Sequence, residues 1–229
     1  IKFEIEPGWH IYWKNPGDSG LPAEIEWKNI ESVEFKNFLW PSPQKTPEGP
    51  LMTYGYYNEV VIPAIFSVNR DYIENEPSIF EIDFLICEKI CIPEKAVIDF
   101  ALSNYSDEDI QFSRKILSSW YRELPTKFDS KLLVEASDNY FSIEWESGNS
   151  DITEAYFFPE NNGLIKYSSK QDFYILENSL KLIVERPVKY SSNIQNAIGV
   201  LEVKLPNKKK TYQIDKPIDY IDKIEIPET

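Results

Sequence analysis

The sequence predicts an all-β protein, built from two tandem immunoglobulin-like β-sandwich domains joined by a short helical connector. Short runs of aromatic and β-branched residues recur along the 229-residue chain, and glycine- and proline-rich turn signals separate them. The length suits two sandwiches of roughly 100 residues each. Hydrophobic residues make up 42% of the chain and aromatic residues 14%. This composition is sufficient for buried cores and excludes general disorder.

The first half of the chain reads as a series of short strands. Residues 1–6 alternate apolar and charged side chains, as a half-buried strand does. The segments 16–20 and 41–50 are rich in proline and glycine and predict turns and loops. We expect strands at 1–6, 9–13, 23–27, 33–40, 60–68, 79–86 and 96–102. This number of strands in about 100 residues is typical of an immunoglobulin-like sandwich, here predicted over residues 1–104.

The pattern changes once, near the middle of the chain. Ser106 can cap a helix with Asp109 at its third position, and the acidic residues that follow Ser106 suit the positive helix end. Apolar residues then recur at roughly helical spacing until Pro125. These residues are Ile110, Ile116, Leu117, Trp120 and Leu124. The sequence therefore predicts a helix over 107–123, within a connector at 105–127.

From residue 128 the strand pattern resumes and predicts a second sandwich over 128–229. Asn162-Gly163 lies between two apolar runs and is the strongest hairpin signal in the chain. The expected strands are 140–145, 153–158, 164–168, 173–176, 180–185, 197–205 and 211–214. This half contains no cysteine and no cluster that suggests catalysis. We therefore expect it to act as a spacer or a docking surface.

Charge and hydropathy exclude several functions. The formal net charge is −14, whereas nucleic-acid binding requires a basic surface and docking on anionic lipid is also disfavoured. No run of 18 uncharged apolar residues is present, so we expect no membrane span in this sequence. The chain begins with Ile1 and shows no signal peptide, so we expect a processed or trimmed start.

The one constellation able to carry chemistry is the pair Cys87 and Cys91, the only cysteines in the chain. Four extended residue steps span about 13 Å, but a disulfide requires Cα atoms within roughly 7 Å. The backbone must therefore reverse between the two cysteines. The flanking strands at 79–86 and 96–102 suggest a tight hairpin in which the cysteines face each other.

The cysteine pair permits three interpretations. Closing so short a loop contributes only about 2 kcal/mol, against nearly 5 for a loop of about 100 residues, so we favour a redox-active disulfide. A structural bridge in a non-enzymatic partner-binding module is the first alternative. A copper(I) site, in a copper-tolerance protein, is the second. Zinc requires four ligands, and only His10 and Met52 are available to extend a metal site, so we expect no metal and no cofactor.

Several motifs resemble the N-terminal region of the DsbD/ScsB family of thiol:disulfide interchange proteins, more closely its ScsB-like branch. The longest is residues 7–22, with the sequence PGWHIYWKNPGDSGLP. It is followed by Trp40-Pro41, by residues 53–56 (TYGY) and by the cysteine segment 87–94 (CEKICIPE). The resemblance covers residues 1 to about 102 strongly. It is weaker in the second half, through residues 155–159.

The resemblance implies a protein-disulfide reductase activity in the periplasm, on the N-terminal ectodomain of an inner-membrane protein. The electron donor would be a thioredoxin-like domain of the same full-length protein, supplied by a membrane-embedded domain. The acceptors would be periplasmic isomerases or thioredoxin-fold proteins, including those of cytochrome c maturation. Contact with the membrane would then come only through parts outside this sequence.

The resemblance also implies roles for individual residues. Cys91 would form the mixed disulfide with the partner, and Cys87 would resolve it. A loop that caps the cysteines in the family aligns with residues 52–57, where Thr53, Tyr54, Gly55 and Tyr56 are the candidates. We expect Gly55 to give such a loop freedom to move. The three residues between the cysteines are fewer than in the better-known DsbD domain, which leaves the identity of the partner open.

Overall fold

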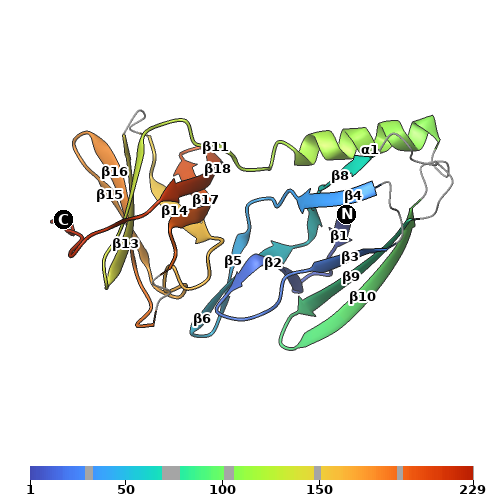
Figure 1. The fold of residues 1–229 in the computed structure, drawn as a ribbon, viewed down its shortest axis with the longest axis horizontal. Coiled ribbons are helices and arrows are strands. Elements are labelled where there is room, and N and C mark those ends of the chain that lie inside the picture. The colour runs from blue at the N-terminus through green and yellow to red at the C-terminus, as the bar shows by residue number, and fades with distance from the viewer. Residues whose placement is uncertain (29–32, 69–77, 101–105, 147–150, 190–192, 229) are drawn as a thin grey trace. The chain divides into compact units, whose positions relative to one another are not determined.

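The computed structural model describes residues 1–28, 33–68, 78–100, 106–146, 151–189 and 193–228. It is mostly β, with one helix between two β regions (Figure 1). The chain divides into two compact units. The first contains Ile1–Thr46 and Tyr54–Leu124, and the second contains Pro47–Thr53 and Pro125–Thr229. The predicted β class is therefore correct, and the immunoglobulin-like strand order and the domain limits stay predictions.

The central sheet of the N-terminal region has the order β10-β9-β2-β6-β5, and β3 also pairs with β9. Two further strand pairs are β1 with β7 and β4 with β8. In chain order these strands are β1 (Lys2–Glu4), β2 (His10–Gly17), β3 (Glu24–Lys28), β4 (Val33–Phe38), β5 (Gln44–Glu48), β6 (Leu51–Tyr57), β7 (Glu59–Val61), β8 (Ala64–Val68), β9 (Ser78–Cys87) and β10 (Cys91–Phe100).

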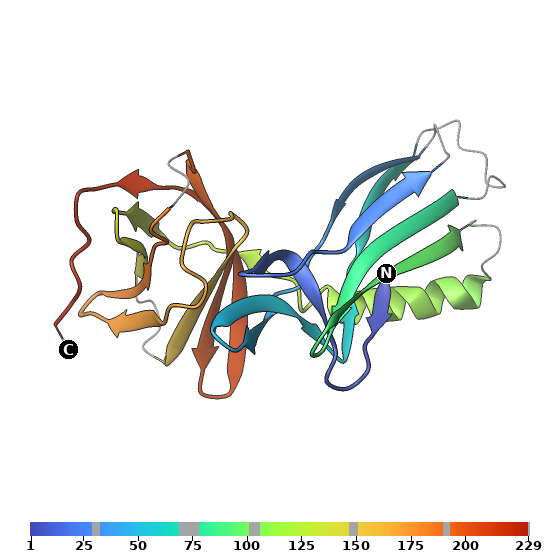
Figure 2. The same ribbon diagram turned by 90° about the horizontal axis from the view of Figure 1, so that it is seen from below.

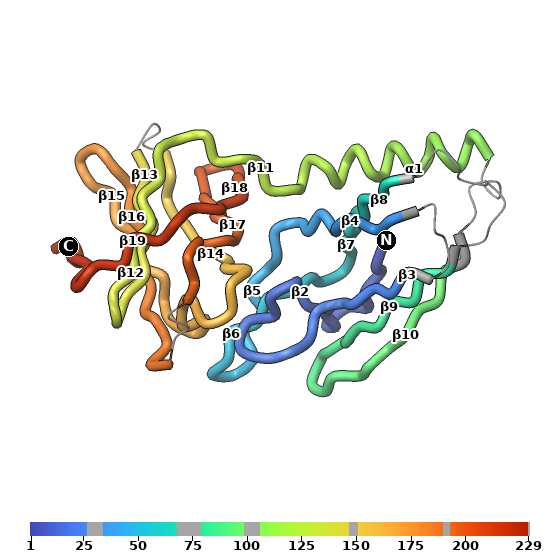
Figure 3. Tube along the Cα trace, viewed as in Figure 1, coloured from blue at the N-terminus to red at the C-terminus, as the bar shows by residue number. Residues whose placement is uncertain are grey.

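Strands β9 and β10 form one long antiparallel hairpin, seen as adjacent green strands in Figure 2. Along its other edge β9 pairs with β3 through Ile79–Asp83 and then with β2 through Ile86 and Cys87. The tight turn of this hairpin follows Cys87. Figure 3 shows the trace reversing between β9 and β10. The sheet therefore brings β2 alongside the cysteine end of the hairpin.

Two expectations for this region were wrong. The segment 41–50, expected to be a loop, contains β5 and lies just before β6. The expected strand 60–68 is two strands, because the chain leaves one pairing and enters another at Ile62-Pro63. There the amide of Ile62 donates to the Ile1 carbonyl, and the Pro63 carbonyl accepts from the Leu39 amide. Proline has no amide hydrogen to continue a ladder, which suits this break.

Helix α1 (Asp107–Trp120) begins as the sequence predicts, although it ends three residues before the expected limit of 123. The Ser106 hydroxyl accepts from the Asp109 amide, and the Asp109 carboxylate accepts from the Ser106 amide at 2.9 Å. The Ser106 hydroxyl also donates to the Asp109 carboxylate, at 2.6 Å, and this bond together with that from the Ser106 amide lowers the pKa of Asp109 from its ordinary value. Such a reciprocal pair satisfies donors that a helix start would otherwise leave unpaired.

The C-terminal region holds two sheets, with strand orders β11-β18-β17-β14 and β15-β16-β13-β12-β19. A stacked ring pair, Phe141 with Phe157 at 5.5 Å, joins a strand of one sheet to a strand of the other. The strands are β11 (Thr126–Lys127), β12 (Leu132–Ala136), β13 (Tyr140–Glu146), β14 (Glu154–Pro159), β15 (Gln171–Ile175), β16 (Ser179–Glu185), β17 (Asn196–Leu205), β18 (Lys208–Pro217) and β19 (Asp219–Tyr220).

Two further predictions fail in this region. Asn162-Gly163 forms a turn but no hairpin, because β14 pairs with β17 and β15 pairs with β16. The segment 164–168 is irregular rather than a strand. Its apolar residues Leu164 and Ile165 are fully buried, so they serve the core without pairing in a ladder. Hairpins form instead between β12 and β13, between β15 and β16, and between β17 and β18, the last through residues 206 and 207.

Candidate functional site

The two cysteines form a disulfide at the turn between β9 and β10, as their spacing predicts. Cys87 ends β9 and Cys91 begins β10, directly opposite in the antiparallel register. Their Cα atoms lie 4.1 Å apart and their sulfur atoms 2.06 Å apart. The Glu88 amide donates to the Ile90 carbonyl at 3.2 Å and closes the turn. The strand register therefore holds the two sulfur atoms at bonding distance.

The two halves of the disulfide differ in exposure. Cys87 is 2% exposed, whereas Cys91 is an exposed residue. Cys91 opens β10, which is the end strand of its sheet and bears exposed residues along most of its length. Cys91 is therefore the member of the pair that another protein can approach more readily.

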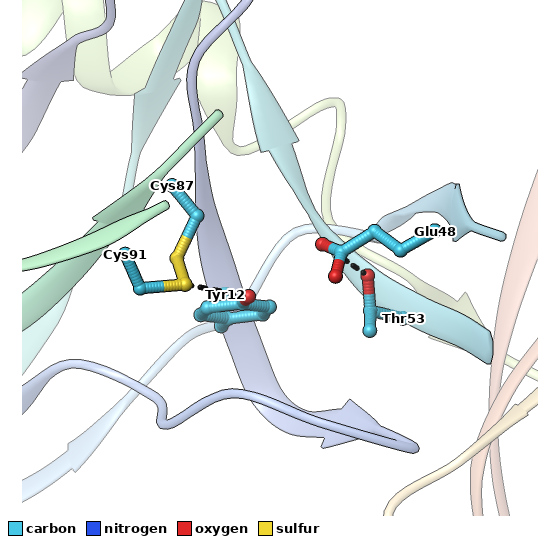
Figure 4. The surroundings of a disulfide bond; sticks show 5 residues. All are labelled: Tyr12, Glu48, Thr53, Cys87 and Cys91. Atoms are coloured by element: carbon cyan, nitrogen blue, oxygen red, sulfur yellow. Dashed lines mark hydrogen bonds between the residues drawn. A yellow bond between two sulfur atoms is a disulfide. The ribbon is translucent and has the colours of Figure 1, made fainter. Parts of the chain in front are cut away.

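The Tyr12 side chain forms a hydrogen bond with the sulfur of Cys91, the exposed cysteine. Its hydroxyl lies 3.5 Å from Cys91 Sγ, and since a disulfide sulfur carries no hydrogen, the phenol is the donor (Figure 4). Tyr12 itself is only 1% exposed. Gly20 explains how the ring is held: a Cβ atom there would lie 2.4 Å from the Tyr12 ring. Gly20 also has a φ of 102°, which favours glycine.

His10 lies on the same sheet face as the cysteines. It is directly opposite Cys87 in the antiparallel pairing of β2 with β9. The His10 ring contacts the Tyr12 ring at 5.1 Å, edge to face, and the Tyr57 ring at 5.5 Å. Cys91, Cys87 and His10 thus form a row across three neighbouring strands, with Tyr12 next to His10 on β2.

The four predicted cap residues do not form a loop. Thr53, Tyr54, Gly55 and Tyr56 all lie within strand β6 and are buried. The Tyr56 hydroxyl donates to the Pro41 carbonyl at 2.7 Å, and burial raises the pKa of Tyr56 well above its ordinary value. The Thr53 hydroxyl donates to Glu48 Oε1 at 3.5 Å, as Figure 4 shows. Their shielding role stays a prediction.

Gly55 has a different purpose from the one expected. It lies in an ordinary strand conformation, and a Cβ atom there would lie 2.3 Å from the Ile11 carbonyl oxygen. Glycine is therefore required because β6 approaches the backbone of β2 closely, rather than because a loop must move.

Sequence reasoning missed both Tyr12 and His10. Two signals were available. The two residues alternate with Ile11, so a strand over 9–13 places them on one face, and that strand carries the only histidine of the chain. Neither signal reveals that β2 pairs with the cysteine end of β9, because this pairing joins segments more than 70 residues apart in sequence.

Both apolar and charged side chains surround the disulfide. Ile90 and Ile92, on either side of Cys91, are exposed, as are Glu88 and Lys89 in the turn. Exposed aliphatic side chains beside a reactive sulfur are suited to contact with another protein.

Among the residues that the structure describes, no group of three or more His, Cys, Asp or Glu side chains is arranged to hold a metal ion. No helix in those residues is long and apolar enough to cross a membrane.

Comparison with known proteins gives two findings. Residues 1–102 match the family described as "Thiol:disulfide interchange protein DsbD, N-terminal". The fold is similar to the crystal structure of the N-terminal periplasmic domain of ScsB from Proteus mirabilis, with a TM-score of 0.71 and 17% sequence identity. That match covers 94% of this chain and 85% of the other. A search of curated protein sequences found no match.

Proposed function

Since residues 1–102 belong to the DsbD N-terminal domain family, we propose that this chain is a relay of a protein-disulfide reductase. The Cys87–Cys91 pair takes electrons from a thioredoxin-like domain, itself reduced through a membrane-embedded reductase of the same full-length protein. It passes them to thioredoxin-fold or isomerase proteins. The compartment we propose is the periplasm, as the N-terminal ectodomain of an inner-membrane protein, which agrees with the periplasmic ScsB domain of similar fold.

The observation that carries this proposal is the unequal exposure of the two cysteine residues. In the reduced pair, the Cys91 thiolate attacks the disulfide of the acceptor, and one acceptor sulfur leaves as a thiolate. Cys87 then attacks Cys91 Sγ, which releases the reduced acceptor and restores the Cys87–Cys91 bond. The exposed sulfur suits the first step because it needs another protein, and the buried sulfur suits the second because it does not.

A trapping experiment with single-cysteine variants tests these roles. Cys87→Ser leaves the exposed sulfur and Cys91→Ser leaves the buried one, so each variant is the matched control of the other. Both are mixed with a purified thioredoxin-fold protein whose own resolving cysteine is replaced by serine and whose remaining cysteine is activated as a mixed disulfide. Non-reducing electrophoresis then measures the covalent complex.

We expect Cys87→Ser to form the covalent complex at least about tenfold faster than Cys91→Ser, because a buried thiol is inaccessible to the partner. Equal rates would contradict the assignment of roles. Failure of both variants to react would favour a structural disulfide in a binding module. Binding of copper(I) by the reduced pair in preference to exchange would favour the metal-handling alternative.

A further inference from the structure

His10 and the buried sulfur of Cys87 are direct neighbours across two strands. Residues 10 and 87 are partners in the antiparallel pairing of β2 with β9, and Ile11 with Ile86 is the next pair. Side chains directly opposite each other in such a pair project from the same face, with Cβ atoms about 4.5–5.5 Å apart. His10 is 3% exposed and Cys87 is 2% exposed. An imidazole therefore lies beside the less accessible sulfur, out of contact with bulk water.

The surroundings of His10 hold its ring on this face. Tyr12 contacts it edge to face at 5.1 Å, and Tyr57 contacts it at 5.5 Å from the other strand neighbouring β2. Among the described residues, the titratable groups that contact His10 or lie opposite it include the phenols of Tyr12 and Tyr57 and the thiol of reduced Cys87. The turn also carries the charged side chain of Glu88, whose carboxylate lies close to Gly8, two residues before His10. These ring contacts and its burial hold the imidazole on the face that it shares with Cys87 rather than in solvent.

The second step of the proposed exchange presents a chemical difficulty at this position. Cys87 must be a thiolate to attack Cys91 Sγ, and burial in apolar surroundings disfavours the thiolate. Water is not available at a side chain that is 2% exposed to take the proton. A neighbouring base would remove the difficulty, and neutral imidazole is the side chain best suited to accept a proton near neutral pH.

We propose that His10 is the general base for the resolving step. This inference rests on the proposed exchange function and adds the proton acceptor to it. The Cys87 S–H bond breaks and its proton moves to the imidazole of His10. The resulting thiolate forms a bond to Cys91 Sγ, while the bond from Cys91 to the partner sulfur breaks and its electron pair leaves on that sulfur. The Cys87–Cys91 pair is oxidised, the partner is reduced, and His10 returns the proton to the departing thiolate or to solvent.

The reaction of the reduced full chain with dithionitrobenzoate separates this step from the first. Cys91 attacks the reagent and releases one coloured thionitrobenzoate anion, at a rate that depends on reagent concentration. Cys87 then releases the second anion from Cys91 in an intramolecular step that does not depend on concentration. Stopped-flow absorbance, recorded from pH 5.5 to 9, gives the two rate constants separately.

We expect His10→Gln to slow the second phase about tenfold or more at pH 7, because an ordinary thiol with a pKa near 8.5 is only a few per cent ionised there. The first phase should change less than about twofold. Tyr57→Phe is the matched control: it keeps the ring against His10 and removes only a hydroxyl, so it should slow the second phase far less than His10→Gln does. A second phase in His10→Gln within twofold of the unaltered protein would overturn the proposal.

The unaltered protein supplies a second test that needs no substitution. Its second-phase rate should rise with pH as the imidazole loses its proton and then level off once the imidazole is neutral. In His10→Gln the rate should instead keep rising beyond pH 8. A profile in the unaltered protein without an inflection below pH 7.5 would contradict the role of His10. Complete absence of the second release, by contrast, would contradict the proposed exchange function itself.

Discussion

At the scale of single residues, the chemistry depends on how two side chains, those of Tyr12 and His10, lie relative to the two cysteines. The Tyr12 hydroxyl touches the exposed sulfur, and His10 stands beside the buried one. The Tyr12 ring packs against Gly20, at a position where a Cβ atom on any other residue would clash with it. The two cysteines thus have different neighbours, which is what a pair with one attacking and one resolving member requires.

Replacing Tyr12 by phenylalanine tests the hydroxyl alone. In the reduced protein this hydroxyl can donate to the Cys91 thiolate and stabilise it, and a hydrogen bond to a charged group contributes about 1.5 kcal/mol or more. We expect Tyr12→Phe to slow alkylation of Cys91 by iodoacetamide at pH 7 by about three- to tenfold, since 1.4 kcal/mol corresponds to a factor of ten. Alkylation at an unchanged or higher rate would show that the contact does not stabilise the thiolate. Tyr57→Phe is the control.

The sequence predicts the cysteines of the site but not their neighbours. Cys87 and Cys91 follow from their spacing, because a short separation flanked by two strands permits few backbone paths. Tyr12 and His10 depend on which strand lies beside β9, and this long-range pairing has no local signal in the residues themselves. The aromatic residues chosen from the sequence, Tyr54 and Tyr56, are instead buried in β6.

At the scale of elements, β6 is the clearest difference between expectation and structure. A run with glycine between two tyrosines indicates a flexible loop when it is read alone. The same glycine permits close contact between two strands when β2 lies against it. In the same way, Asn162-Gly163 carries a strong turn signal and does form a turn, but the strands that pair are determined elsewhere in the chain. Local sequence signals therefore predict where the chain turns better than they predict which strands pair.

The close approach of β6 to β2 leads to a stability prediction. Gly55→Ala places a Cβ atom against the Ile11 carbonyl oxygen, and backbone cannot give way cheaply. We expect the free energy of unfolding to fall by about 3 kcal/mol or more, at the upper end for overpacked sites, because the clashing atom belongs to the backbone. Urea unfolding followed by tryptophan fluorescence measures it.

Gly49→Ala is the comparison for this substitution. Gly49 has a φ of 60° but no atom within 4 Å of an added Cβ, so it reports backbone strain without a clash. We expect a loss of about 1 kcal/mol there. A Gly55→Ala protein as stable as the Gly49→Ala protein would contradict the account of β6.

At the scale of the whole chain, the two β regions differ in which reactive side chains they contain. Both cysteines and the histidine lie in the first, and no described residue of the second is a cysteine or histidine. The predicted division into 1–104, a connector at 105–127 and 128–229 gives the second region a spacer or docking role. A chain that ends at Leu124 should then retain most of its rate of disulfide exchange with a thioredoxin-fold partner, whereas Cys87→Ser with Cys91→Ser should lose all of it.

Formation of the Cys87–Cys91 bond in the shortened chain, measured by thiol titration, is the control that it still folds. Equal loss of exchange in the shortened chain and in the double cysteine variant would contradict the spacer role. A partial loss confined to one acceptor protein would indicate that the second region contributes to docking.

The most direct measurement is the redox equilibrium of the Cys87–Cys91 bond in the folded chain. The protein is equilibrated with glutathione buffers of graded ratio, quenched with acid and alkylated, and the reduced fraction is counted by mass spectrometry. We predict a reversible transition with a midpoint above about −300 mV, since structural disulfides lie below that value. A bond that stays oxidised through this range, or that is reduced only when the protein unfolds, would contradict the electron relay.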